Sequence, residues 1–289
     1  KEYVIENILW QVAERKLSQE LKLDAEISHL GKNYQLTNQC LLNHPANFIK
    51  CDSALDQIDF ALLKNFFTSP FLTASEGSAK VAFKTYLKPD KMVVSLALMA
   101  GPTRLFNPFG QVISFDNLAL TLKYRSSEQQ LLLTIEELRR ANKQMAGQIK
   151  LTAKDSGIID LLIALEGSNL TASDIPLLWP EIGPKRARNW LLQNLKQAKV
   201  KTGQFKMALQ INKRDQLKKT KINDLSAIFE FTDGDLTYSR FLPRLRQAEG
   251  RVIISQEQVD IWLKRGQAAS LKIEDLKVEI GNLRKPASR

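Results

Sequence analysis

The feature that most constrains this chain is a two-residue alternation of apolar and polar side chains that recurs along most of its length. Four large apolar residues, Phe205, Met207, Leu209 and Ile211, alternate with small or polar ones without a break. Successive side chains of a strand point to opposite faces of a sheet, so this segment predicts a strand with one apolar face. The pattern recurs at residues 118–124, 131–135, 149–153, 225–231, 252–254 and 271–280. Polar turns separate these runs, which predicts an antiparallel meander and not alternating strands and helices.

Two segments depart from the alternation and predict helices. From Tyr3 to Leu21 the apolar residues fall near helical spacing, which predicts an amphipathic N-terminal helix. A second helix is predicted near residues 184–196, where Pro184 suits the first helical turn and an apolar stripe follows. Asp233-Gly234 predicts a two-residue hairpin turn, because glycine accepts positive φ at no steric cost.

A long meander with one apolar face must cover that face, and few helices are predicted to do so. Two sheets could stack as a sandwich, or one curved sheet could fold around an apolar interior. Sandwiches are the more frequent solution. A curved sheet that does not close would leave an apolar groove wide enough for acyl chains.

Composition places the chain among globular proteins and restricts its partners only loosely. Of the 289 residues 44% are hydrophobic and 25% are charged, which argues against wholesale disorder. The net charge of +11 suits either nucleic acid or an anionic membrane surface. The densest basic run, residues 213–221, contains no aromatic residue and is better interpreted as a solvated loop than as a nucleic-acid patch. No apolar run reaches the length of about 18 residues that a membrane-spanning helix needs, so we expect any anchor to lie upstream of Lys1.

Motifs for catalysis are lacking. The two histidines, His29 and His44, have no metal-binding or nucleophile motif around them, and no glycine-rich phosphate loop occurs. Glu136 and Glu137 would point to opposite faces of a strand and could not share a proton. The sequence therefore predicts no catalytic residue, no metal ligands and no cofactor, and we expect a protein that is not an enzyme.

The only two cysteines, Cys40 and Cys51, leave two interpretations open. In an oxidising compartment they could form a disulfide, which would stabilise the fold by about 3 kcal/mol. They could equally be two unpaired, half-buried thiols. The absence of a CxxC pair argues against a redox or zinc motif.

Two stretches carry a resemblance to a known family. The first combines Leu178-Trp179-Pro180, a helix with Arg188 and Trp190, and the strand that follows Gly203. The second combines Phe229 and Phe231 with the segment from Gly234 to Tyr238, then Leu242-Pro243 and Gly250. Over about residues 110–281 the chain resembles the central domain of YhdP-like proteins, which belong to the AsmA-like superfamily. The first hundred residues resemble the start of AsmA-like chains more weakly.

The resemblance implies a mainly β fold, in which a long, twisted and curved antiparallel sheet forms a half-pipe with an apolar groove. It implies an AsmA-like region at residues 1–105 and a YhdP-like central domain at residues 106–289. The implied function is that of a segment of a bridge-like lipid transport protein in the periplasm of a Gram-negative bacterium, between inner and outer membranes. The implied partners are phospholipid, the inner membrane through an anchor, and outer-membrane or envelope proteins, but no nucleic acid.

The candidate groove lining consists of apolar residues that alternate along the predicted strands. Its members are Leu120, Leu122, Leu133, Phe205, Met207, Leu209, Ile211, Phe229 and Phe231. At any single position ordinary core packing is the slightly better interpretation. Two alternatives to lipid transport are a structural or envelope-assembly domain with a closed core and a basic nucleic-acid-binding β protein.

Overall fold

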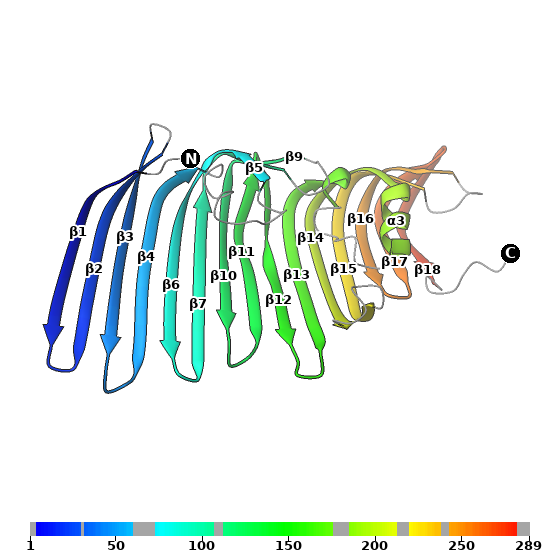
Figure 1. Ribbon diagram of the computed structural model, residues 1–289. Helices are drawn as coiled ribbons and strands as arrows, with labels where there is room; N and C mark the ends of the chain where they lie inside the picture. Colours follow the sequence, from blue (N-terminus) through cyan, green and yellow to red (C-terminus); the bar gives the residue numbers. More distant parts are fainter. Residues whose placement is uncertain are drawn as a thin grey trace. The chain divides into compact units, whose positions relative to one another are not determined.

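The computed structural model describes residues 4–29, 32–59, 73–106, 112–175, 185–212, 220–237 and 243–281. It divides into two compact units, Lys1–Ala141 and Asn142–Arg289. Most described residues belong to one large antiparallel sheet of fifteen strands, eight in the first unit and seven in the second (Figure 1). The mainly β fold class is confirmed. The predicted domain boundary at residues 105 and 106 falls inside the first unit, and it stays a prediction.

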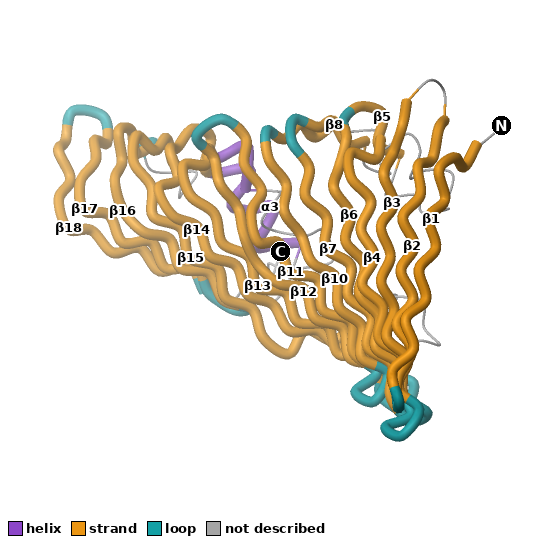
Figure 2. The backbone as a smooth tube through the Cα atoms, turned by 90° about the vertical axis from the view of Figure 1, so that its left-hand side faces the viewer, coloured by secondary structure: helices purple, strands orange, loops and turns teal. Residues whose placement is uncertain are grey.

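The first unit is a meander with one small sheet inserted. Its large-sheet strands lie in the order β1-β2-β3-β4-β6-β7-β10-β11, and β5, β8 and β9 form the small sheet. The turns that join β1 to β2, β3 to β4 and β6 to β7 gather at one end of the strands (Figures 1 and 2). The strands are β1 (Val4–Arg15), β2 (Ser18–His29), β3 (Lys32–Asn43), β4 (Phe48–Asp59), β5 (Thr73–Glu76), β6 (Ser78–Lys88), β7 (Lys91–Ala100), β8 (Thr103–Phe106), β9 (Val112–Phe115), β10 (Asn117–Arg125) and β11 (Gln130–Arg140).

The second unit is a simpler meander of longer strands. All seven strands are neighbours in chain order from β12 to β18. They are β12 (Lys143–Ala153), β13 (Ile158–Thr171), β14 (Leu195–Asn212), β15 (Thr220–Leu236), β16 (Leu245–Ser255), β17 (Val259–Ala268) and β18 (Leu271–Ile280). A 3-10 turn, η1 (Ala172–Asp174), follows β13, and α3 (Lys185–Asn194) runs directly into β14. The helix predicted near 184–196 is thereby confirmed.

The predicted N-terminal helix is wrong, since this segment forms β1 and the start of β2. A β-bulge around Asn7, whose φ is 54°, inserts one extra residue between Glu6 and Leu9. The bulge shifts the alternation, so that Ile5 and Trp10 lie opposite Ile27 and Leu23, which alternate on one side of β2. An alternation broken by one residue produces apolar spacings of three to five, which imitate a helix.

The predicted hairpin at Asp233-Gly234 is also wrong, because these residues lie inside the single long strand β15. Asp233 has a φ of 52°, and the pairing shifts by one residue between Phe231 and Gly234. The left-handed conformation that the Asp-Gly pair favours therefore forms a bulge that bends the strand. The same local chemistry serves both a turn and a bulge, and only the tertiary pairing decides between them.

Candidate functional site

The strands of the first unit align their apolar side chains into rows that cross the sheet. Residues directly opposite each other on paired strands lie on the same face. One row consists of Leu36, Leu55, Val81, Leu98 and Leu120, and the next contains Phe83, Leu96, Leu122 and Leu133. We call this side of β1–β4, β6, β7, β10 and β11 the open face. Trp10 and Val12 extend it onto the edge strand β1.

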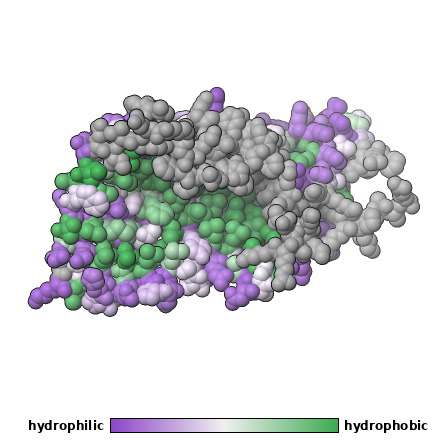
Figure 3. Space-filling view, in the orientation of Figure 1, coloured by the Kyte–Doolittle hydropathy of each residue, from purple (hydrophilic) through white to green (hydrophobic). Residues whose placement is uncertain are grey.

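Exposure on the open face rises along the strands from one end to the other. At the end away from the hairpin turns, Tyr34, Ala79 and Leu118 belong to a buried cluster. Near the turns, Ile49, Leu87 and Met92 are 36–39% exposed. Figure 3 shows apolar residues gathered across the first unit, with hydrophilic residues along the hairpin end. The open face is therefore a largely apolar surface that is buried at one end and accessible at the other.

The opposite side of the same strands is mostly polar and carries charged pairs. The Lys80 Nζ lies 3.3 Å from Asp56 Oδ1, and Asp52 lies 3.2 Å from the Lys50 Nζ. Exposed pairs of this kind add little to stability, but they keep this side hydrated. The sheet of the first unit is thus amphipathic, with one side suited to water and the other to an apolar ligand.

A hydrogen-bonded cluster closes the buried end of the open face. Tyr34 is buried and donates its hydroxyl hydrogen to Asp59 Oδ2 at 3.1 Å, and the Lys32 Nζ lies 2.7 Å from the same oxygen. Burial, together with the hydrogen bond to the Asp59 carboxylate and its charge, raises the pKa of Tyr34 to about 12. The phenol therefore stays neutral at physiological pH, and it satisfies its polar atom at the edge of an apolar cluster.

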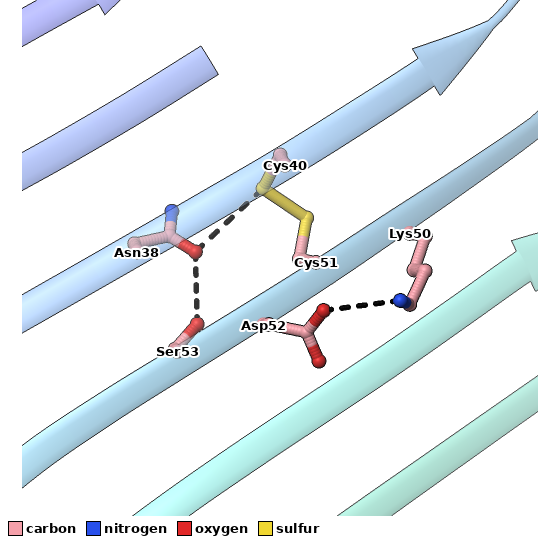
Figure 4. The surroundings of a disulfide bond; sticks show 6 residues. All are labelled: Asn38, Cys40, Lys50, Cys51, Asp52 and Ser53. Carbon is pink, nitrogen blue, oxygen red and sulfur yellow. Dashed lines mark hydrogen bonds and ion pairs between the residues drawn. A yellow bond between two sulfur atoms is a disulfide. The ribbon is translucent and has the colours of Figure 1, made fainter. Parts of the chain in front are cut away.

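Polar residues interrupt the open face on β3 and β4. Cys40 and Cys51 lie directly opposite each other and form a disulfide with their Cα atoms 4.1 Å apart (Figure 4). Two residues further along each strand, on the same face, Ser53 donates to Asn38 Oδ1 at 2.9 Å. Of the two interpretations of the cysteines, the structure therefore has the disulfide and not two unpaired thiols. The bond links the neighbouring strands β3 and β4.

Removal of the disulfide is expected to lower the free energy of unfolding of the first unit. A bond that closes a loop with a separation of eleven residues restricts the unfolded chain by about 2–3 kcal/mol. The Cys40→Ala/Cys51→Ala double variant should therefore unfold at lower denaturant concentration than the oxidised protein. Dithiothreitol should lower the midpoint of the natural chain similarly and leave that of the variant unchanged. An equal response of both proteins to the reductant would contradict the assignment.

The second unit also has a continuous apolar face, but its side chains are inaccessible. Phe205, Ala227, Val252 and Ile261 are each fully buried and come from four consecutive strands. Leu191 of α3 is likewise buried, and α3 contacts β14, into which it continues. Figure 2 shows α3 beside the strands of this unit. This face has the properties of a packed core.

The predicted groove residues divide between the two faces. Leu120, Leu122 and Leu133 lie half-buried on the open face. The six from the second unit are at most 8% exposed, and they share its buried face. The members of that group are Phe205, Met207, Leu209, Ile211, Phe229 and Phe231. Whether any of the nine contacts lipid stays a prediction.

Sequence reasoning did not select several members of the open face. Trp10 and Val12 lie in the segment that was predicted to be a helix, and Val81 and Phe83 lie outside the alternating runs named above. The signal that could have found them is the pairing of β6 with β7, which places Phe83 opposite Leu96. The register between paired strands brings short apolar segments together into one surface. The sequence of a single strand does not show that register.

Within the described ranges we find no cluster of three or more metal-ligating side chains. His44 lies exposed in the turn between β3 and β4. In the same ranges no helix has the length and apolarity to cross a membrane. What the described sheet offers to a ligand is apolar surface with a few hydrogen-bonding groups.

Comparison with known proteins agrees with the resemblance that the motifs indicated. A family model described as YhdP protein matches residues 77–288, which begins just before β6 and includes the described strands of the second unit. Searches of curated proteins and of solved structures found no match. Since the family model matches well over half of the sequence, the chain belongs to the YhdP protein family.

Proposed function

We propose that this chain is a segment of a bridge-like lipid transport protein, and that its open face binds the acyl chains of phospholipids. The observation that carries the proposal is the accessible apolar surface across the strands of the first unit. Soluble proteins rarely expose contiguous apolar patches beyond a few hundred Å² unless something binds there. A charged, hydrated opposite side makes the same sheet stable in water.

The chemistry of the open face suits a ligand that must bind and still move. Each methylene group transferred from water to an apolar surface is stabilised by about 0.8 kcal/mol. A row such as Leu36, Leu55, Val81 and Leu98 offers similar contacts at every strand. An acyl chain that crosses the strands therefore meets no deep energy minimum, which permits sliding.

The proposed location is the periplasm. Attachment to the inner membrane and contact with outer-membrane or envelope proteins are further parts of the proposal. The disulfide between Cys40 and Cys51 supports an oxidising compartment, because such bonds persist there and are rare in the cytosol. Family membership supports the envelope assignment.

A pair of methionines on β7 allows a matched test of lipid binding. Met92 lies on the open face and Met99 on the polar side, and both are at least 36% exposed, so neither aspartate substitution should unfold the sheet. We expect Met92→Asp to lower the phospholipid that co-purifies with the chain by roughly tenfold, because a carboxylate against an acyl chain is desolvated without a partner. Met99→Asp should leave the lipid content unchanged. Native mass spectrometry with lipid extraction measures both.

A second substitution on the open face tests lipid binding at another position, so that the conclusion does not depend on Met92 alone. Phe83→Asp places the charge in the middle of the open face, where Phe83 lies opposite Leu96 and Ser53. Melting curves establish that each variant remains folded. Equal lipid content in the natural chain and in the three folded variants would contradict binding at the open face.

The buried face of the second unit favours a second candidate function, that of a structural or envelope-assembly domain with a closed core. Phe229 and Phe231 are at most 1% exposed, as core residues are. This candidate predicts a folded natural chain without any co-purifying lipid. The measurement above therefore decides between the two functions.

A further inference from the structure

Hydrogen-bonding side chains lie on the open face among residues that are otherwise apolar. Beside Asn38 and Ser53, already described, the face contains Thr85 on β6 and Tyr124 on β10. All four are half-buried. A surface that met only hydrocarbon would be better served by leucine, valine or phenylalanine at these positions, because a desolvated polar group costs free energy unless it is paired.

The four residues lie in two adjacent rows that cross the strands. Asn38 lies opposite Ser53 in the row that continues through Phe83 and Leu96. Cys51 lies opposite Thr85 in the neighbouring row. That row continues through Val94 to Tyr124. Neighbouring strands are about 4.8 Å apart, so the set extends about 19 Å across the sheet from β3 to β10.

Most of the donors in this set are unused. Ser53 donates to Asn38 Oδ1, which leaves the two N–H groups of the Asn38 amide. In the part of the chain that the structure describes, the Asn38 amide nitrogen and the hydroxyl groups of Thr85 and Tyr124 have no hydrogen-bond partner. Half-buried donors without described protein partners on this apolar face remain available for acceptors that a ligand would supply.

We propose that Asn38, Ser53, Thr85 and Tyr124 form a track that donates hydrogen bonds to the ester carbonyl oxygens of acyl-glycerol lipids. This inference rests on the proposed function, and it specifies which chemical class of lipid the open face prefers. Ester carbonyls accept but do not donate, which matches this set of donors. The two rows contain no lysine or arginine, the side chains that a phosphate group would select.

The donors of the track are too widely spaced to form a single binding site. Thr85 and Tyr124 are two strand spacings apart, about 10 Å, with the apolar Val94 between them. The four donors also come from four different strands, β3, β4, β6 and β10. The track therefore offers successive positions, and a lipid exchanges one set of hydrogen bonds for the next as its acyl chains move over the face.

The test uses substitutions that remove only the hydroxyl groups. Thr85→Val/Tyr124→Phe keeps the shapes of both side chains, and neither hydroxyl has a described partner whose loss would unfold the sheet. The matched control, Thr37→Val/Tyr86→Phe, makes the same changes on the polar side of β3 and β6. Native mass spectrometry with equal amounts of diacyl and dialkyl phosphatidylethanolamine of the same chain length measures the preference for ester over ether linkage.

The natural chain and the control variant should retain the diacyl lipid about fivefold more than the dialkyl lipid, since one neutral hydrogen bond changes binding by about that factor. The Thr85→Val/Tyr124→Phe variant should lose most of this preference and keep only the part that Asn38 and Ser53 supply. A natural chain that binds both lipids without preference, or a variant that keeps the full preference, would overturn the track while leaving lipid binding intact. A natural chain that binds neither lipid would instead contradict the proposed function.

Discussion

Replacement of Phe229 with alanine is expected to lower the free energy of unfolding of the second unit by about 3–5 kcal/mol. Phe229 is 0% exposed, and it lies on β15 opposite Gly203 of β14 and Val252 of β16. Truncation removes the transfer free energy of the ring, and it leaves a cavity that the neighbouring strands fill only partly. Chemical denaturation followed by circular dichroism measures the change.

A phenylalanine on the open face supplies the control. Phe83 is 39% exposed on β6, so Phe83→Ala should cost less than about 1.5 kcal/mol. The comparison keeps the chemical change constant and varies only the burial. If Phe229→Ala cost as little as Phe83→Ala, the face of the second unit would be an accessible groove and not a packed core.

The burial of the second unit also determines where lipid binding can be probed. A charge at Met207, which is 1% exposed, would place an unpaired carboxylate in the core and unfold the unit. Loss of lipid from such a variant could not be separated from loss of structure. Probes on the open face, such as Met92 and Phe83, avoid this ambiguity because their side chains already contact solvent.

The sequence predicted the strands of the second unit well, and the same regularity led to the choice of most of the candidate groove residues. The alternation from Phe205 to Ile211 is the cleanest in the chain, and it belongs to one of its most deeply buried strands. A fully buried face tolerates no polar residue, whereas the open face includes Asn38 and Ser53. Perfect alternation therefore indicates a core, and an interrupted one accompanies the accessible surface.

Bulges account for the errors in element type. Asn7 broke the alternation on β1 and led to a helix prediction, and Asp233 was assigned to a turn. A third bulge at Gln57 keeps Ile58 opposite Ala79 and thus on the buried side of β4. Each bulge is fixed by pairing with the next strand, which a single sequence does not contain. By contrast, α3 was predictable, because its apolar stripe and the preceding proline are both local signals.

A glycine on β16 has the second large expected effect. A Cβ atom at Gly250 would lie 2.1 Å from the carbonyl oxygen of Trp262 and 3.1 Å from the Cα atom of Leu263, both on β17. These are backbone atoms, which cannot rotate away as a side chain does. We therefore expect Gly250→Ala to force β16 and β17 apart and to lower the free energy of unfolding by at least about 3 kcal/mol. This is the upper end of the usual cost of placing extra atoms in a well-packed site.

Gly266, on β17, provides the matched control for Gly250→Ala. Its nearest neighbour for an added Cβ is the Cα atom of Ala248 at 3.6 Å, an ordinary van der Waals contact. Gly266→Ala should therefore be neutral or stabilise the second unit by about 0.5 kcal/mol, because alanine restricts the unfolded chain. Comparison of the two variants thus distinguishes the effect of a close contact between strands from the general effect of replacing a glycine in a strand. A cost for Gly250→Ala no greater than that for Gly266→Ala would mean that β16 and β17 can shift apart freely, and the closed core that their pairing supports would then be too loose to exclude a lipid.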